Sequence, residues 1–205
     1  MHIAVVGNIG VGKTTLTKLL SEHYNWSPLY EDVLENPYLE DFYNQMHRWS
    51  FNLQIYFLNS RFRQTLDIQS SGKTMIQDRS IYEDAFIFAP NLHAMGLMSS
   101  RDFQNYKSVF DLMSSLIQGP DLLIYLKSSV PNLLRQIKRR GREYEVGISK
   151  EYLQNLNIRY DTWIQDCDPK KLLIIDVDTF NFVDRPEDLQ EIIHKIDSKI
   201  NLFTS

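Results

Sequence analysis

The stretch GNIGVGKTT, residues 7–15, has the residue types and spacing of a loop that binds phosphate. It matches the pattern G-x-x-x-x-G-K-S/T, in which glycines let the backbone wrap around phosphate oxygens while amides point inward. Lys13 would reach the terminal phosphates of a nucleotide, and the Thr14 hydroxyl would hold Mg²⁺. We therefore predict that these residues bind a nucleotide: Gly7, Asn8, Ile9, Gly10, Val11, Gly12, Lys13, Thr14 and Thr15.

An Asp-Arg pair in the stretch TMIQDR supplies the next candidates for chemistry. Asp78 follows an apolar run and could hold Mg²⁺ directly or through water, together with Thr14. Arg79 could stabilise charge on a phosphoryl group during its transfer. The alternative for such a pair is a surface salt bridge.

Glu31 is the candidate that separates two kinds of phosphoryl transfer. A sugar hydroxyl is a poor nucleophile until a base takes its proton, so a nucleoside kinase needs a carboxylate near the phosphoryl target. A nucleoside monophosphate kinase has an anionic acceptor, which a carboxylate would repel. Glu31 ends the short run PLYE, a position that suits a general base, and Asp78 is the next candidate for that role. GTPase motifs of the type D-x-x-G and N-K-x-D do not occur.

Short apolar runs alternate along the chain with longer helical patterns. The expected strands are residues 2–6, 74–77, 121–126 and 171–177, with 28–31 as a weaker fifth. The expected helices are residues 13–24, 38–70, 81–88, 99–118, 130–139, 149–166 and 186–203. Apolar strands that alternate with helices predict an α/β fold with a parallel sheet covered on both faces. Ligands of such sheets bind at the carboxyl ends of the strands, where the candidates above lie.

Composition limits the possible partners. The formal net charge is −4, so no overall attraction to nucleic acid or anionic membrane is expected. Cys167 is the only cysteine, which excludes an intrachain disulfide. No apolar run reaches the length of a membrane span, and no leader pattern precedes HIAVVG. We expect a cytoplasmic protein with one domain, residues 1–205.

The candidate motifs occur in an order that resembles the deoxyribonucleoside kinase family. After the phosphate loop come EDV at 31–33, NPYLEDFY at 36–43, RWSFNLQIYFLNSR at 48–61, DRSIYED at 78–84 and RGREYEVGI at 140–148. The resemblance covers nearly the whole chain and includes deoxycytidine, deoxyguanosine and bacterial deoxyadenosine kinases. It implies a P-loop kinase fold with an arginine-rich lid, with ATP as phosphate donor and Mg²⁺ as cofactor.

The resemblance also implies roles for single residues at the sugar and the acceptor hydroxyl. Glu31 corresponds to the base that accepts the proton of the 5′-hydroxyl, and Arg79 to the arginine that contacts that oxygen and the phosphates. Tyr43 and Glu145 correspond to the pair that hydrogen-bonds the 3′-hydroxyl, with the tyrosine ring where a ribose 2′-hydroxyl would lie.

At the base, the resemblance implies a second set of roles. Gln54 corresponds to the residue that reads the base edge, and an amide offers a donor and an acceptor together. Arg61 and Asp84 correspond to the pair at the far end of the base pocket, where their charges would compensate each other. Phe88 corresponds to the ring stacked on the base, although an aromatic there also fits ordinary core packing.

The basic run RQIKRRGRE, residues 135–143, resembles the family's lid over the phosphates, with Arg140 and Arg142 as lid arginines. The alternative is a solvated helix end. Gln136 departs from the arginine that the family often has there, so Arg135 or Arg139 would replace it. The segment 176–180 falls where the family's loop for the ATP adenine lies.

Phe57 lies one helical turn from Gln54 and Arg61 and resembles the bacterial enzymes for purine deoxynucleosides. We favour deoxyadenosine as substrate, then deoxyguanosine or deoxycytidine. The family also implies a homodimer, for which the apolar residues of 38–70 and 99–118 are suited. Two alternatives stay open: a nucleoside monophosphate kinase, and a non-catalytic subunit that binds nucleotide with the same fold.

Overall fold

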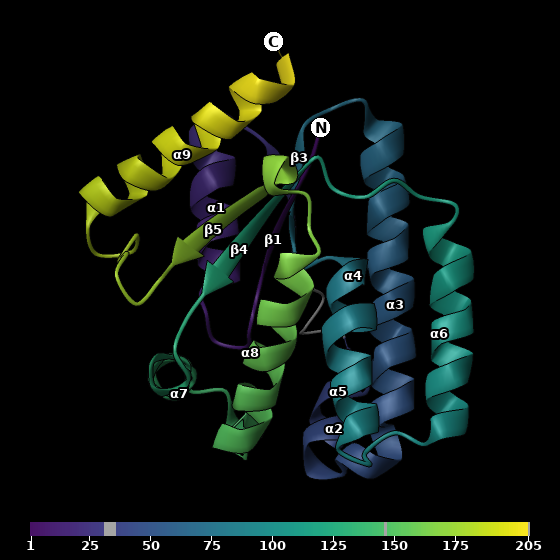
Figure 1. Cartoon of the computed structure of the whole chain (residues 1–205). Helices are drawn as coiled ribbons and strands as arrows, with labels where there is room; N and C mark the ends of the chain where they lie inside the picture. Colours follow the sequence, from purple (N-terminus) through teal and green to yellow (C-terminus); the bar gives the residue numbers. More distant parts are fainter. Residues whose placement is uncertain (31–35, 146, 205) are drawn as a thin grey trace.

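The computed structural model describes residues 1–30, 36–145 and 147–204. Its centre is a five-stranded, all-parallel sheet in the order β2-β3-β1-β4-β5, which confirms the predicted fold class (Figure 1). The strands are β1 (His2–Gly7), β2 (Ser27–Leu29), β3 (Met75–Asp78), β4 (Leu122–Lys127) and β5 (Leu172–Asp176). Each predicted strand is therefore present, with ends that differ by one or two residues.

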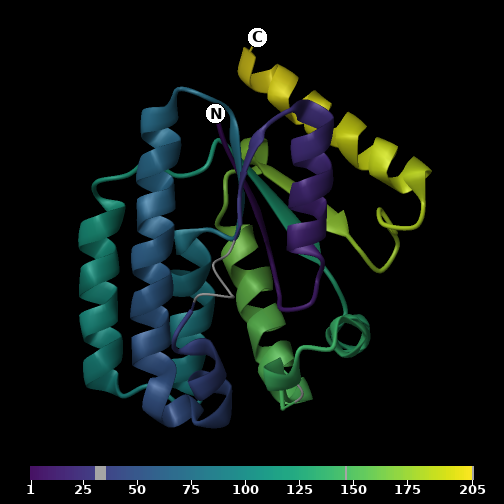
Figure 2. The ribbon, with the colours of Figure 1, turned by 180° about the vertical axis from the view of Figure 1, so that it is seen from behind.

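Helices cover both faces of the sheet. They are α1 (Lys13–Tyr24), α2 (Leu39–Asn44), α3 (Met46–Ser71), α4 (Ile81–Glu83), η1 (Asp84–Phe88), α5 (Ala89–Ala94), α6 (Ser100–Ser114), α7 (Val130–Arg140), η2 (Glu143–Glu145), α8 (Lys150–Gln165), η3 (Pro169–Lys171) and α9 (Pro186–Thr204). Helices α1 and α9 share one face, where the Tyr24 hydroxyl of α1 donates to Asp197 of α9 at 2.8 Å. Figure 2 shows α1 in front of the sheet, with α3 and α6 side by side at the edge of the molecule.

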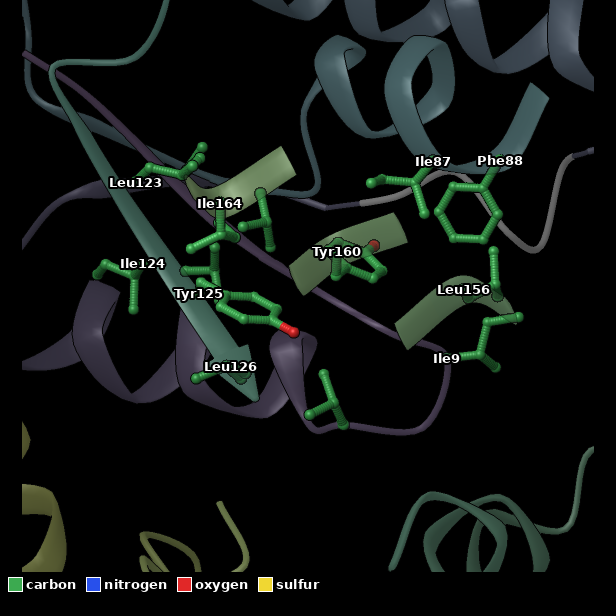
Figure 3. Packing of buried hydrophobic residues seen from close by; sticks show 14 of the residues in the cluster. Ile9, Ile87, Phe88, Leu123, Ile124, Tyr125, Leu126, Leu156, Tyr160 and Ile164 are labelled. Atoms are coloured by element: carbon green, nitrogen blue, oxygen red, sulfur yellow. The ribbon is translucent and has the colours of Figure 1, made fainter. Parts of the chain in front are cut away.

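The other face of the sheet packs against α8 and η1. Tyr125 of β4 stacks on Tyr160 of α8, with ring centroids 5.5 Å apart, and both rings are buried. Figure 3 shows these rings with Ile87 and Phe88 of η1 beside α8. Burying such large apolar side chains contributes roughly 1.5–3 kcal/mol each, so this layer fixes α8 and η1 against the strand ends.

The predicted helix 38–70 is wrong in one respect, because it is two helices. Gln45 separates α2 from α3 with φ −142° and ψ 68°, values outside the helical region. The Gln45 amide still donates to the Asp41 carbonyl at 2.8 Å, so α2 ends in a satisfied turn. The break turns α2 so that Phe42 is buried and Tyr43 reaches the cavity described below.

The predicted helix 81–88 is too short, because the helical path continues to Ala94. Residues Asp84–Phe88 form a π-helical turn, in which the Ala89 amide donates to the Asp84 carbonyl five residues earlier. Pro90 has no amide hydrogen and cannot make the usual bond to residue 86. The wider turn absorbs that missing donor, and π turns of this kind often occur at functional sites.

Helix α6 ends at Ser114, four residues before the end predicted for it. The other predicted helices agree with the structure to within one residue. Within the described residues, no helix combines the length and apolar character that a membrane crossing requires.

Candidate functional site

A cavity of about 650 Å³ opens at the carboxyl ends of β1 and β3. The sheet rule therefore predicts its place correctly. These sequence-predicted site residues line it: Ile9, Gly10, Gly12, Lys13, Thr14, Thr15, Tyr43, Gln54, Phe57, Arg61, Asp78, Arg79, Asp84, Phe88, Arg140, Arg142 and Glu145. Gly7, Asn8 and Val11 are not among the lining residues, and Glu31 lies outside the described part of the chain.

The phosphate loop connects β1 to α1 and needs its glycines. Gly10 and Gly12 have φ values of 83° and 98°, a left-handed backbone that other residues rarely adopt. A Cβ on Gly7 would lie 2.6 Å from the Leu126 carbonyl oxygen, so the start of the loop packs directly on β4. The Lys13 ammonium donates to the Gly7 and Asn8 carbonyls at 2.9 and 2.8 Å, and thus lies over the loop.

Asn8 fixes the loop from behind instead of facing the cavity. Its side-chain oxygen accepts from the Ile9 amide at 2.7 Å, and its amide nitrogen donates to the Leu153 carbonyl at 2.9 Å. The same nitrogen lies 2.7 Å from the side-chain oxygen of Asn157. The loop is therefore tied to α8 as well as to the sheet.

Thr14 and Asp78 meet at the floor of the cavity. The Thr14 hydroxyl donates to an Asp78 carboxylate oxygen at 2.5 Å. A hydroxyl and a carboxylate are hard oxygen ligands that suit Mg²⁺, which typically takes one or two protein oxygens and completes its shell with phosphate and water. The described residues hold no cluster of three or more His, Cys, Asp or Glu side chains suited to a metal.

Arg79 adopts an unusual backbone conformation directly after β3. Its φ is 72°, in the left-handed region, and its amide donates to the Val5 carbonyl at 3.0 Å. The guanidinium lies 4.8 Å from the centre of the Phe88 ring. Such a strained backbone costs about 1–3 kcal/mol and persists at functional sites because the surroundings hold it.

The opposite end of the cavity is built on one face of α3. Gln54, Phe57 and Arg61 are each less than a tenth exposed and line the cavity together. The Arg61 guanidinium lies 4.5 Å from the centre of the Phe57 ring and forms a buried ion pair with Asp84 of η1. The helical spacing thus predicts correctly that these side chains share one wall.

Asp84 is fully buried within this wall. Burial raises the pKa of Asp84 to about 7, while the Arg61 guanidinium acts in the opposite direction. Burial also raises the pKa of Tyr106 on α6, well above its usual range, and the Asp84 charge adds to that effect. Polar groups in this wall are therefore far from water, where an unpaired donor or acceptor is costly.

Gln54 has such an unpaired acceptor. Its side chain is 3% exposed, and its Oε1 has no hydrogen-bond partner among the described residues. Leaving a buried acceptor unsatisfied costs about 1–3 kcal/mol. Because Gln54 lines the cavity, a ligand with a hydrogen-bond donor would satisfy it.

The predicted lid arginines contact a predicted sugar-binding residue. The Arg140 Nε and Nη2 atoms donate to the Glu145 carboxylate at 3.1 and 2.5 Å, and Arg142 lies 3.5 Å from it. Tyr144, which lies between Arg142 and Glu145 in the chain, stacks on Tyr43 with ring centroids 5.6 Å apart. The structure therefore brings the lid and α2 together over the cavity.

Comparison with known proteins agrees with this geometry. The family model described as deoxynucleoside kinase matches residues 3–201. The chain belongs to this family. It is 40% identical over 202 residues to the deoxyadenosine/deoxycytidine kinase of Bacillus subtilis, covering 97% of this chain and 93% of the relative. It is 42% identical over 192 residues to the deoxyadenosine kinase of Dictyostelium discoideum, and the match covers 94% of this chain and 77% of the relative.

A solved structure of deoxyadenosine kinase from M. mycoides, with products dCMP and a flexible dCDP bound, superposes on this kinase with a TM-score of 0.85. Its sequence is 28% identical, and the match covers 97% of this chain and all of that chain. The P-loop kinase fold predicted from the sequence is thereby confirmed.

The structure describes the arginines beside Gln136 and the segment 176–180 of the kinase. Arg139 lines the cavity beside Gln136, whereas Arg135 donates to Asn132 at 3.1 Å, so Arg139 is the arginine available near Gln136. In segment 176–180, Asp178 accepts hydrogen bonds from the start of α7, for example from the Ser128 hydroxyl at 2.7 Å. Val183, three residues beyond that segment, lines the cavity instead.

Glu83 is the residue of the kinase that the sequence analysis missed. It is completely buried behind the cavity and accepts hydrogen bonds from the Gly7 amide at 3.1 Å and from the Tyr160 hydroxyl at 2.5 Å. The available signal was the spacing S-x-x-E in DRSIYED, which is typical of a helix cap. Tyr160 carried no signal of its own, because it comes from α8, far along the chain.

Proposed function

We propose that this kinase transfers the terminal phosphoryl group of ATP to the 5′-hydroxyl of a deoxyribonucleoside, with deoxyadenosine favoured over deoxyguanosine and deoxycytidine. The observation that carries the proposal is one continuous cavity. At one end lies a phosphate loop with Lys13, and at the other a buried amide, Gln54, that lacks a partner among the described residues. A donor phosphate and an acceptor nucleoside fit one cavity of this kind end to end.

Lys13, Arg79 and the lid would act on the phosphates. Preorganised cations stabilise the charge that spreads over the oxygens of a transferring phosphoryl group. Arg79 is held between the P-loop and Phe88, which supports a role for its positive charge where donor and acceptor would meet. Arg140 and Arg142 of the lid would exchange their contacts with Glu145 for phosphate oxygens when the lid closes.

Glu31 is proposed as the general base. It would take the proton of the 5′-hydroxyl while the 5′-oxygen bonds to the terminal phosphorus and the bond from that phosphorus to the bridging oxygen breaks, releasing ADP. This role rests on sequence position and family resemblance, since β2 ends two residues before Glu31. If Glu31 is not the base, Asp78 is the next candidate.

Thr14 and Asp78 are proposed to hold Mg²⁺, because their oxygens meet beside the phosphate loop. The ion would neutralise phosphate charge when bound. The hydrogen bond from the Thr14 hydroxyl to the Asp78 carboxylate joins the phosphate loop to the end of β3 and holds both groups in place.

The nucleoside would occupy the end of the cavity formed by α2, α3 and η1. Tyr43 and Glu145 would hydrogen-bond the 3′-hydroxyl, and Phe88 would stack on the base, which is worth about 1–3 kcal/mol in comparable contacts. Gln54 would read the base edge, because a buried amide favours a ligand that satisfies it.

The preference for deoxyadenosine rests on Phe57 and on the relatives. Phe57 lines the cavity together with Gln54 and Arg61, and it resembles the residue of bacterial enzymes for purine deoxynucleosides. Of the two relatives compared above, one is named for deoxyadenosine and the other for deoxyadenosine and deoxycytidine. The buried Arg61–Asp84 pair supports a polar base edge rather than the methyl group of thymine.

We also propose that the kinase is a cytoplasmic homodimer of single-domain subunits. Apolar side chains remain exposed on its helices, including Leu112 of α6, Phe86 of η1 and Ile158 of α8. Phe86, Ile158 and Trp163 line one groove between η1 and α8, which a second subunit would cover. Sedimentation of a monomer at micromolar concentration would contradict the dimer.

The function is tested with a substrate panel. Purified protein is given ATP, Mg²⁺ and each of the four deoxynucleosides or their monophosphates, and kcat/KM is measured for each. We expect turnover of deoxynucleosides, fastest for deoxyadenosine, and none of monophosphates. Turnover of monophosphates alone would identify a nucleoside monophosphate kinase, and no turnover of any acceptor would indicate a non-catalytic subunit.

A further inference from the structure

Glu83 lies behind the cavity and its carboxylate is surrounded by donors. Its Oε2 accepts from the Ser80 amide at 2.9 Å, and its Oε1 accepts from the Gly7 amide, the Tyr160 hydroxyl and the Arg79 guanidinium, at 3.1, 2.5 and 3.3 Å. The side chain is 0% exposed. A buried carboxylate needs such partners, since desolvation otherwise disfavours its charge.

Helix capping explains only one of these four contacts. Glu83 is the third residue of α4, and its bond to the Ser80 amide completes a capping box. Asp102 has the corresponding position in α6, after Ser99, and there the acidic side chain is partly exposed and contacts its own helix end. The Oε1 of Glu83, in contrast, bonds to Gly7 and Tyr160 from two distant parts of the chain, and to Arg79 directly before the cap.

These bonds fix both polar groups of Gly7. The Gly7 amide donates to Glu83, while the Gly7 carbonyl lies 2.9 Å from the Tyr160 hydroxyl and also accepts from Lys13. Tyr160 carries one hydroxyl proton and is stacked on Tyr125, so its oxygen stays between the carboxylate and the carbonyl. The phosphate loop is therefore anchored where it leaves β1.

The same carboxylate oxygen holds Arg79. The guanidinium Nη1 also lies 3.4 Å from the Gly7 carbonyl, and the backbone of Arg79 is held in the left-handed region. A strained backbone alone would relax without contacts to hold it. Glu83 supplies a charge-assisted contact to the guanidinium and is not itself among the residues that line the cavity.

We propose that Glu83 is a positioning residue for phosphoryl transfer, which holds the Arg79 guanidinium and the beginning of the phosphate loop in one fixed arrangement. The inference rests on the proposed role of Arg79 at the acceptor hydroxyl. The proposed contacts to the donor phosphates and to the acceptor hydroxyl come from two different strand ends, β1 and β3, and Glu83 is bonded to residues at both. Since a displacement of about 1 Å can lower a rate about 100-fold, a fixed distance between the two strand ends has kinetic value.

Glu83→Gln tests this proposal. Glutamine keeps the shape but has only one acceptor oxygen, so its NH₂ group faces either the Ser80 amide or the donors of Gly7 and Arg79, and in both cases the negative charge beside Arg79 is lost. We expect kcat per active site, counted by titration with deoxyadenosine, to fall about 10- to 100-fold, with KM for deoxyadenosine within threefold of wild type. Asp102→Asn, the matched change in the cap of α6, leaves kcat unchanged.

A merely structural role gives a different result. It would lower the melting temperature and the number of active sites, but leave kcat per active site within threefold, and that outcome overturns the proposal. Tyr160→Phe provides a second variant should Glu83→Gln not fold. It is expected to lower kcat several-fold without a change in KM, whereas Tyr125→Phe on the stacked ring leaves kcat unchanged; equal kcat in the two variants also overturns the proposal.

A double-mutant cycle separates this inference from the role of Arg79. If Glu83 acts partly through Arg79, Glu83→Gln lowers kcat by a smaller factor in an Arg79→Gln background than in wild type, and fully multiplicative losses overturn the proposal. Wild-type turnover of Arg79→Gln alone would contradict the proposed role of Arg79 as well. Normal turnover of Glu83→Gln beside an inactive Arg79→Gln would overturn only the inference about Glu83.

Discussion

The two ends of the cavity differ in how their polar groups are satisfied. At the phosphate end, Lys13 donates to loop carbonyls and Thr14 to Asp78, so these groups bond within the protein. At the base end, Gln54 keeps an acceptor that none of the described residues satisfies, although it is buried. The bonds of Lys13 and Thr14 are in place before a ligand arrives, whereas the Gln54 acceptor is satisfied only by a ligand.

This difference assigns separate tasks to the two ends. Groups that are fixed in advance need no reorganisation during a reaction, which favours the transition state. A buried group without a partner rejects ligands that leave it unsatisfied, which favours specificity. We infer that changes at the phosphate end lower kcat, whereas changes at the base end alter the choice and affinity of the nucleoside.

Lys13→Ala should have the largest effect. Without the ammonium over the phosphate loop, we expect kcat to fall about 10³-fold, as when a preorganised charge is removed from a transition state. Lys18→Ala removes an exposed lysine from the same helix and should leave kcat unchanged. Turnover of Lys13→Ala within tenfold of wild type would contradict the division of tasks.

Glu31→Gln should have the next largest effect. Removing a general base lowers turnover about 10²- to 10⁴-fold, and deoxyadenosine affinity should stay nearly intact because the amide keeps the shape of the side chain. Steady-state kinetics and equilibrium binding measure the two quantities. Glu22→Gln on the exposed face of α1 is the control, and turnover of Glu31→Gln within a few-fold would move the role of base to Asp78.

Gln54→Leu should mainly change which deoxynucleoside the kinase binds and how tightly. Its loss removes one hydrogen bond to the base, so kcat/KM for deoxyadenosine should fall about 10- to 100-fold, chiefly through KM. Gln69→Leu, farther along α3 and exposed, should leave both constants unchanged. If kcat/KM for Gln54→Leu stays near wild type for all four deoxynucleosides, the base is not read by this amide.

Replacing Asp84 should have the smallest effect, which we expect on the free energy of unfolding. The pKa of Asp84 is about 7 in the folded protein, above the ordinary value of 3.8, so the folded state binds an extra proton between these values. Stability from this group is therefore present at low pH and is lost as pH rises from about 4 to about 7.

Asp84→Asn removes this titration. The free energy of unfolding of wild type, measured relative to Asp84→Asn by urea denaturation, should decrease by about 1 kcal/mol or more over that pH range. A difference that is constant, or that increases with pH, would contradict a raised pKa.

The sequence predicted the parts of the site that depend on local pattern. The phosphate loop, Asp78 at a strand end and the shared face of Gln54, Phe57 and Arg61 each follow from spacing within one element. Parallel strands then bring these elements to one edge of the sheet, which a general rule of such folds predicts.

The parts that sequence reasoning missed depend on contacts between distant elements. The break at Gln45 turns α2 toward the cavity, and no glycine or proline marks it. The burial of Glu83 follows from α8 packing on β4, which puts Tyr160 beside Gly7, far away in the chain. The contact of Arg140 with Glu145 likewise depends on how the chain folds back after α7.

The central claim is that nucleoside recognition is separate from the machinery for phosphoryl transfer. It is tested most directly by titrating deoxyadenosine into Lys13→Ala and measuring the dissociation constant calorimetrically. The account predicts a Kd within about twofold of the wild-type value, even though turnover is lost. A Kd more than tenfold weaker, in a variant that remains folded, would show that the two ends of the cavity do not act separately.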